Sequence, residues 1–186
     1  MDSETTFRVA SPADWQAIIA IYNQGIDDGY CNAFTSHLSV EGHRHWLQIH
    51  DGVEYAIFVA EVDHTVVGWC SLSPYRIDRQ AFRTIGEISY YFDRAYRGKG
   101  IGYRLAAHAI ELAPEYNLHT LLAFLLDINK VSVNLLEKLG FIRWGHFPDI
   151  ATVRGTICGQ FIYGKNLASL PGPAAGIKEG PNWGRW

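Results

Sequence analysis

A glycine-rich segment between a predicted strand and a predicted helix most constrains the fold of this chain. The segment reads Arg97-Gly98-Lys99-Gly100-Ile101-Gly102. The run EISYYF before it is apolar and aromatic, as in a strand, and the run GIGYRLAAHAIELA spaces its apolar residues along one helical face. Glycines let the backbone approach a ligand closely, and the N-terminus of a helix attracts anions. This strand, loop and helix therefore predict a phosphate-binding loop in a mixed α/β domain.

The spacing of the glycines separates three kinds of phosphate-binding loop. A P-loop requires GxxxxGK[ST], whereas Lys99 lies between glycines and no serine or threonine follows it. A dinucleotide-binding loop requires GxGxxG, whereas Gly98, Gly100 and Gly102 are spaced GxGxG. The remaining possibility is a pyrophosphate held by consecutive backbone N–H groups, with Arg97 and Lys99 adding positive charge.

The rest of the chain continues the mixed pattern. A strand at FRVA precedes a helix that starts at Ser11 and stops at Gly29, and a second helix is expected after Ser39. The runs YAIFVAEV and TVVGWCSLS predict a hairpin, and HTLLAFLLD predicts a buried central strand. Asn129 can cap a helix that Gly140 ends, and FIRWGHF and TICGQFIYG predict two last strands. We expect one domain over residues 1–165 and a Pro/Gly-rich tail over 166–186.

Composition narrows the class of protein and of partner. The chain has 186 residues, 48% of them hydrophobic, which is enough for one packed core. A net charge of −3 predicts no binding to nucleic acid or membrane, so the partner is expected to be a small molecule. Three widely spaced cysteines and a polar N-terminus predict a cytoplasmic protein, and the histidine spacing between residues 43 and 50 predicts no metal site.

Several segments together resemble a known family. RGKGIG fits the [RQ]-x-x-G-x-[GA] acetyl-CoA signature of GNAT-type N-acetyltransferases. Within this family, the chain is similar to the phosphinothricin acetyltransferase branch over roughly residues 7 to 165. The segments that carry this similarity are IYNQGI, VVGWCSLSPYR, FRTIGEISYYF and NKVSVNLLEKLGF. The resemblance implies the GNAT fold, in which a mixed, mostly antiparallel sheet is splayed at the acetyl-CoA site and flanked by helices. It also implies a homodimer.

The same resemblance implies how acetyl-CoA is held. The backbone of the strand would pair with the pantetheine arm, the glycine loop would bind the pyrophosphate, and two residues near the next helix would contact the cofactor. The residues are Tyr90, Tyr91, Phe92, Arg97, Gly98, Lys99, Gly100, Ile101, Gly102, Tyr103, Asn129 and Lys138. Ordinary strand packing is the alternative for Tyr90 and Phe92, and it is compatible with backbone binding.

Glu87 is the candidate general base. A lysine-like amine with a pKa of about 10.4 is protonated at pH 7, which costs roughly 4–5 kcal/mol before it can attack. Glu87 aligns with the catalytic glutamate of the phosphinothricin branch and lies in an otherwise apolar strand, where burial would raise its pKa. A solvated glutamate on an edge strand is the alternative. The tyrosine that many family members carry four positions before the Gly-Phe pair is Leu136 here, so the general acid is in doubt.

The acceptor side has weaker signals. By resemblance, Phe34, Phe82 and Arg83 face the substrate, and Arg83 could clamp a carboxylate, although an exposed loop arginine is the alternative. The G-x-W-x-D run of the branch is GTICG here, which weakens phosphinothricin itself as the substrate. We expect a small amino-acid-like amine as the acceptor. The alternatives are a protein or peptide N-acetyltransferase and a non-catalytic acyl-CoA sensor.

Overall fold

The computed structural model describes residues 4–167, which form a seven-stranded sheet in the order β1-β2-β3-β4-β5-β7-β6. Neighbouring strands are antiparallel except β4 and β5, which are parallel. The sheet is thus mixed and mostly antiparallel, as predicted, and it is not closed. Its strands are β1 (Thr5–Val9), β2 (Ala56–Val62), β3 (Thr65–Pro74), β4 (Ile85–Phe92), β5 (Thr120–Leu126), β6 (Ile142–Val153) and β7 (Thr156–Asn166).

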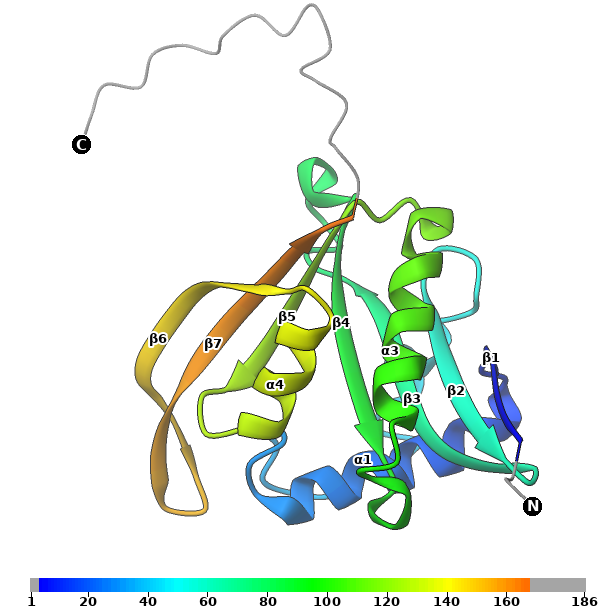
Figure 1. Ribbon diagram of the computed structural model, residues 1–186, viewed down its shortest axis with the longest axis horizontal. Helices are drawn as coiled ribbons and strands as arrows, with labels where there is room; N and C mark the ends of the chain where they lie inside the picture. The colour runs from blue at the N-terminus through cyan, green and yellow to red at the C-terminus, as the bar shows by residue number, and fades with distance from the viewer. Residues whose placement is uncertain (1–3, 168–186) are drawn as a thin grey trace, which may run out of the picture.

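Strands β4 and β5 are paired over only part of their length. Their register begins where Ile85 faces Thr120 and ends where Glu87 faces Leu122. Beyond this point β4 stays paired with β3, and β5 stays paired with β7. Figure 1 shows the two strands close together at the top of the view and apart at the bottom. The sheet is therefore splayed between residues 88–92 and residues 123–126, with Glu87 at the fork.

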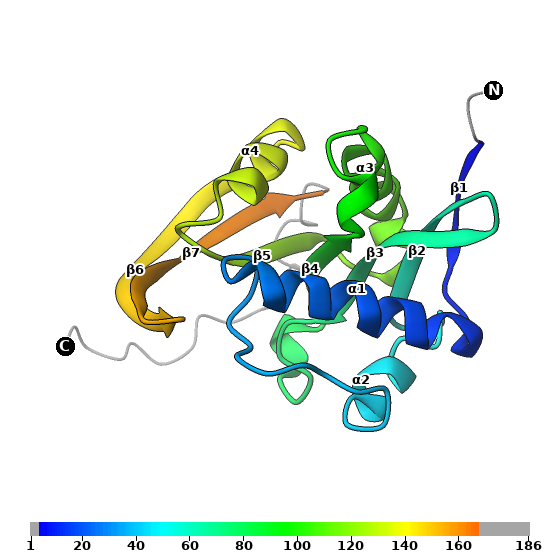
Figure 2. The ribbon, with the colours of Figure 1, turned by 90° about the horizontal axis from the view of Figure 1, so that it is seen from below.

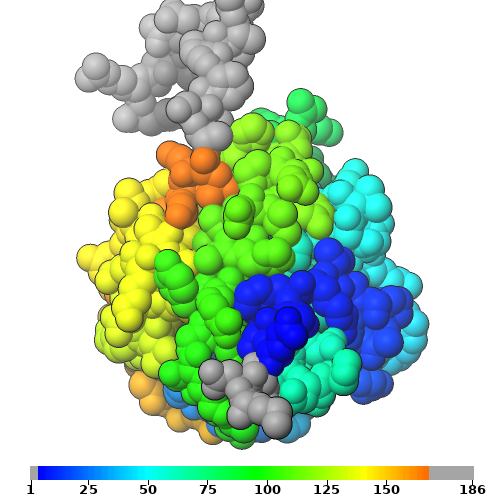
Figure 3. Space-filling model, turned by 45° about the vertical axis from the view of Figure 1, so that its right-hand side comes forward, coloured from blue at the N-terminus to red at the C-terminus, as the bar shows by residue number. Residues whose placement is uncertain are grey.

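Helices cover both faces of the sheet. Figure 2 shows α1 (Trp15–Asp28) and α2 (Arg44–Gln48) on one face, and α3 (Ile101–Leu112) and α4 (Lys130–Lys138) on the other. In Figure 3 the surface of α3, in green, separates the yellow surface of α4 and β6 from the blue surface of the N-terminal strand. Each face of the sheet has its own apolar core. Large buried side chains of the α3 face include Phe58, Leu72, Leu105 and Leu121, and those of the α1 face include Ile18, Leu47 and Trp69.

Local signals explain where the helices begin and end. Ser11 and Asp14 form a capping box before α1, and Gly29 ends that helix with a left-handed φ of 74°. The Asn129 side chain accepts a hydrogen bond from the Ser132 N–H at 3.1 Å, which caps α4. These caps confirm the helix boundaries predicted from the sequence.

The predicted elements are present, with two details to add. The helix expected after Ser39 is the five-residue α2. Asn166, the first residue of the expected tail, is the last residue of β7, and residues 168–186 lie outside the described part of the chain. Within residues 4–167, no helix has both the length and the hydrophobicity needed to cross a bilayer.

Candidate active site

A groove of about 530 Å³ lies along the splay. One wall is β4 over residues 88–92, the opposite wall includes β5 over residues 123–125 and part of α4, and one end is the glycine-rich loop. We call it the loop groove. Because β4 is paired only with β3 beyond Glu87, half of the N–H and C=O groups of residues 88–92 face the groove instead of another strand. An extended ligand can therefore pair with this edge.

The glycine-rich loop has the conformation that an anion site requires. Gly98 and Gly100 have left-handed φ values of 75° and 77°, which favour glycine, and a Cβ at either position would meet no atom within 4 Å. The open space on their surface leaves room for a ligand beside the backbone. Helix α3 begins at Ile101, and the N–H groups of its first turn lack acceptors within the helix. Loop and helix together can bind a pyrophosphate.

A second cavity of about 310 Å³ adjoins the groove. We call it the Glu87 cavity. It shares five lining residues with the loop groove, so a molecule in one lies next to a molecule in the other. The shared residues are Cys31, Ser89, Tyr91, Phe124 and Leu125, and the Glu87 cavity is further lined by Tyr22, Asn32, Ala33, Phe34, Glu87, Leu126 and Gln160.

Glu87 brings a carboxyl group into the Glu87 cavity, two residues before Ser89, which lines both cavities. It is the last residue of β4 that pairs with β5, and its side chain is half-buried. Burial raises the pKa of this carboxyl above its ordinary value of 4.5. Among the described residues that line the Glu87 cavity, it is the only aspartate, glutamate, lysine or arginine. A proton taken from a ligand in this cavity therefore has one carboxylate nearby to receive it.

Two tyrosines form an aromatic wall beside Glu87. The ring centroids of Tyr22 and Tyr91 lie 4.4 Å apart, and the Tyr91 hydroxyl donates to the Cys31 carbonyl at 3.5 Å. Burial raises the pKa of both phenols, so they stay protonated and act as hydrogen-bond donors. Helix α1 reaches this wall because Gly25 lacks a side chain: a Cβ there would lie 2.8 Å from the Tyr91 ring.

Comparison with known proteins identifies the family. Residues 23–141 match the acetyltransferase (GNAT) family. The chain belongs to the GNAT family. The matched range contains the glycine-rich loop, the splayed strands and Glu87. The protein is therefore an acetyl-CoA-dependent N-acetyltransferase, as the resemblance of its motifs predicted.

Three GNAT relatives illustrate the similarity. "Putative phosphinothricin acetyltransferase YwnH" of Bacillus subtilis is 35% identical over 88% of this chain and 99% of its own length. The L-methionine sulfoximine/L-methionine sulfone acetyltransferase of Salmonella typhimurium is 27% identical over 81% of this chain and 87% of its own. The structure of yncA from Salmonella typhimurium, solved with its cofactor acetyl-CoA, has a TM-score of 0.86 and 26% identity, and covers 93% of this chain and 99% of the other.

Most residues predicted to bind acetyl-CoA lie around the loop groove, and the open, left-handed glycines of the loop fit a pyrophosphate. Lys99 and Ile101 lie outside the lining: the Lys99 ammonium stands 4.8 Å from the centroid of the Tyr96 ring, and Ile101 is buried in the core. The predicted residues that do line the groove are Tyr90, Tyr91, Phe92, Arg97, Gly98, Gly100, Gly102, Tyr103, Asn129 and Lys138.

The predicted acceptor residues divide into two groups. Phe34 lines the Glu87 cavity. Phe82 and Arg83 are exposed and lie outside the lining of both cavities. Phe82 is linked to the site indirectly, since its ring packs edge-on against Tyr75, which in turn stacks on Phe124 with centroids 6.0 Å apart. A substrate role for Phe82 and Arg83 stays a prediction.

Other lining residues have no counterpart in the sequence predictions. Cys31 and Asn32 follow the end of α1 in a segment that carries no motif. Phe124 lies two residues beyond Leu122, the last residue of β5 that pairs with β4, and the uniform apolar run of that strand hides its position. Gln160, from β7, reaches the cavity only because β7 pairs with β5. The signal that points to them is the splay, because the consecutive β5 residues 123–126 line the two cavities beyond the fork.

Proposed function

We propose that this protein transfers the acetyl group of acetyl-CoA to the primary amine of a small, amino-acid-like molecule, with Glu87 as the general base. The position of Glu87 carries the proposal: its half-buried carboxyl lines the cavity that adjoins the loop groove. The names of the relatives, which refer to phosphinothricin and methionine sulfoximine, support a small acceptor.

Acetyl-CoA is the donor substrate, and it supplies an activated acetyl group as a thioester. The glycine loop from Gly98 to Tyr103 would bind its pyrophosphate through backbone N–H groups. The free edge of β4 over residues 90–92 would pair with its pantetheine arm. A backbone N–H on this edge near Tyr91 or Phe92 is a candidate donor to the thioester carbonyl oxygen.

Glu87 would remove a proton from the amine. The acceptor enters the Glu87 cavity as an ammonium, and the Glu87 carboxylate takes one proton, directly or through a water molecule. The neutral amine nitrogen then attacks the carbonyl carbon, so that the C–N bond forms and the C–S bond breaks. The nitrogen loses its second proton to solvent, which leaves the neutral amide. The raised pKa of Glu87 makes its carboxylate a stronger base than an ordinary carboxylate.

The thiolate of the product does not require an acid on α4. Leu136 is 1% exposed, lines the loop groove and cannot donate a proton. The nearby Tyr90 hydroxyl is committed to the Ser132 carbonyl at 3.4 Å, and burial raises its pKa. A thiol with a pKa of about 8.5 leaves readily at neutral pH. We therefore propose that CoA departs as the thiolate and takes its proton from solvent.

The experiment is a turnover assay with a panel of acceptors. Release of CoA from acetyl-CoA is measured with L-methionine sulfone, L-methionine sulfoximine, phosphinothricin, the common amino acids, polyamines and short peptides. We expect the highest kcat/KM with a free amino acid or an amino-acid analogue. Higher kcat/KM with peptides would favour a protein N-acetyltransferase, and tight acetyl-CoA binding without any turnover would favour the sensor. Homodimer formation, cytoplasmic location and a domain boundary at residue 165 stay predictions.

A further inference from the structure

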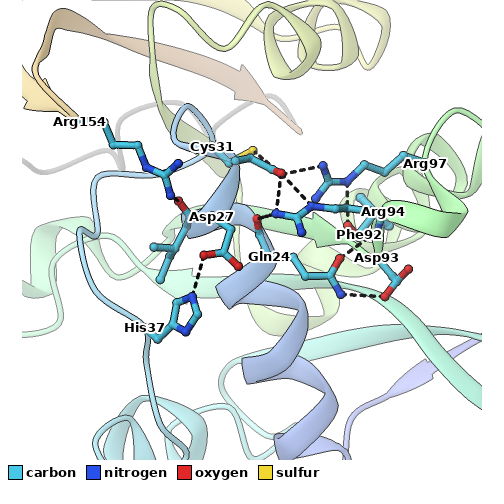
Figure 4. A network of polar contacts seen from close by, with 11 residues as sticks. Gln24, Asp27, Cys31, His37, Phe92, Asp93, Arg94, Arg97 and Arg154 are labelled. Carbon is cyan, nitrogen blue, oxygen red and sulfur yellow. Dashed lines mark hydrogen bonds and ion pairs between the residues drawn. The ribbon is translucent and has the colours of Figure 1, made fainter.

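A cluster of ion pairs joins the end of α1 to the glycine-rich loop (Figure 4). We call Asp28, Arg94 and Arg97 the Asp28 cluster. Arg94 Nε donates to Asp28 Oδ1 at 2.9 Å, and Arg97 Nη1 donates to Asp28 Oδ2 at 2.6 Å. Arg94 also donates through Nη2 to the Gln24 carbonyl at 2.8 Å, and its backbone N–H donates to Gln24 Oε1 at 2.9 Å. The turn before the loop is thus fastened to one side of α1.

Asp28 occupies a position that does not favour an acid. It is the last residue of α1, where the helix dipole is negative, and its side chain is 11% exposed. Burial acts to raise the pKa of this carboxyl, but the hydrogen bonds from Arg97 and Arg94 outweigh it and lower the pKa below its ordinary value. The carboxylate is therefore stable here only because both arginines face it. Its placement requires an explanation other than helix stability.

Arg97 is held by protein groups on two sides. Its Nε donates to the Phe92 carbonyl at 2.9 Å, at the end of β4, while its Nη1 is bonded to Asp28. Figure 4 shows the Arg97 guanidinium turned toward α1. The predicted role of Arg97, positive charge for the pyrophosphate, competes with these bonds. The next residue is Gly98, so the same side chain fixes the start of the loop.

Asp28 also contacts Cys31, a residue that lines both cavities. The Cys31 thiol lies 3.7 Å from Asp28 Oδ2, and the Cys31 carbonyl accepts the Tyr91 hydroxyl. Cys31 lines both cavities, and it leads into Asn32 and Phe34 of the Glu87 cavity. One carboxylate therefore contacts the start of the loop that borders one cavity and the segment that borders the other.

We propose that Asp28 is a positioning residue, which holds the glycine-rich loop and residues 30–34 in one arrangement. We call residues 30–34 the acceptor wall. In this arrangement Arg97 acts through Asp28 and not as a phosphate ligand. The effect on the acceptor rests on the proposed function of the Glu87 cavity. The proposal differs from a phosphate-binding Arg97 in one measurable way. If Arg97 positions the wall, its loss changes acceptor binding even when acetyl-CoA is saturating.

The kinetic test compares Asp28→Asn, Arg97→Gln and the double variant, with Asp27→Asn as the matched control. Asp27 is the preceding residue of α1 and pairs with His37 away from the loop. At saturating acetyl-CoA we expect the acceptor KM to rise about ten-fold in both single variants, and no further in the double variant, because the two residues form one unit. Arg97→Lys should recover part of the loss. A rise confined to the KM for acetyl-CoA in Arg97→Gln, or an unchanged Asp28→Asn enzyme, would overturn the proposal.

A second measurement does not depend on turnover. Hydrogen exchange of the peptide that contains residues 30–34 is compared in the wild type and the same variants, with thermal unfolding to verify that each variant is folded. We expect faster exchange in Asp28→Asn and Arg97→Gln, and wild-type exchange in Asp27→Asn. Unchanged exchange in both cluster variants would refute the positioning role, whatever the assay of acceptors shows. Faster exchange in the cluster variants, together with no turnover of any amine by the wild type, would support the positioning role of Asp28 and reject the proposed function.

Discussion

Glu87→Gln is predicted to make the enzyme slower and the fold more stable at the same pH. Both effects have one cause, the burial that raises the pKa of the Glu87 carboxyl. Glutamine has nearly the same shape and cannot accept the amine proton. A positioned general base contributes about 10²- to 10⁴-fold to a rate, so we expect kcat/KM to fall by roughly this factor near neutral pH.

The loss of activity should depend on pH. In the wild type, kcat/KM rises as Glu87 loses its proton, and it rises again as the amine itself loses a proton. The variant lacks the first rise. As the pH approaches the amine pKa, the neutral amine becomes abundant without a base, so the difference between the two enzymes should shrink.

The stability effect has the opposite sign. Because the folded-state pKa of Glu87 is raised, deprotonation penalises the folded state of the wild type. The penalty is absent below the ordinary value of 4.5 and reaches its full size above the folded-state pKa. Each unit of that rise corresponds to about 1.4 kcal/mol. Relative to the wild type, the variant should therefore gain unfolding free energy as the pH rises above about 4.5, until the pH passes the folded-state pKa.

The assay pairs initial rates of CoA release with urea unfolding across the same pH range. Glu111→Gln is the matched control, since Glu111 is an exposed glutamate on α3, and it should resemble the wild type in both measurements. Wild-type rates for Glu87→Gln at every pH would remove Glu87 from the mechanism. A stability difference that does not vary with pH would show that its carboxyl is not desolvated.

Three further predictions concern the loop, the sheet and the first helix. Gly100→Ala forces alanine into a left-handed φ of 77°, so the KM for acetyl-CoA should rise about ten-fold. Gly155→Ala is the control, because Gly155 has a φ of 81° in equally open space, and it should leave this KM unchanged. Gly68→Ala places a Cβ against the Phe92 ring and should cost about 1–3 kcal/mol in urea unfolding. The pKa of Asp14 is lowered from 3.8 to about 2, mainly by its hydrogen bond from an arginine. This carboxylate therefore contributes about 2 kcal/mol to the free energy of unfolding above pH 4. Compared with Asp14→Asn, that advantage should disappear as the pH falls from about 4 to 2, as measured by acid unfolding.

The fold was predictable because its determinants are local. Ser11, Gly29, Asn129 and Gly140 mark helix ends through their own backbone or side-chain geometry, which a short window of sequence contains. The conformation of the glycine-rich loop was predictable for the same reason, since it depends on its glycines and on the helix that follows. These features need no knowledge of distant contacts.

The acceptor side was less predictable because distant segments assemble it. Cys31 and Phe124 are far apart in sequence, yet both line the two cavities beside the splay of β4 and β5. Arg97 shows the same limit in another form. A basic residue beside a phosphate-binding loop suggests a ligand for an anion, but the Arg97 guanidinium is bound by Asp28, which comes from another element. Charge in a motif predicts a partner only when no protein partner is nearer.

In the proposed mechanism Glu87 acts on the acceptor next to the donor, and the fork in the sheet suits this role. At Glu87 the backbone still pairs with β5, so the carboxyl stands on a rigid part of the sheet, while the next residues of β4 are free to bind an extended donor. A carboxylate farther along β4 would belong to the splayed edge, and one earlier would lie within the paired sheet. Of the β4 residues that line the Glu87 cavity, which are Glu87, Ser89 and Tyr91, only Glu87 has its backbone paired with strands on both sides. Moving the acid by two residues, as in Glu87→Gln combined with Ser89→Glu, should therefore not restore the rate, although Ser89 lines both cavities.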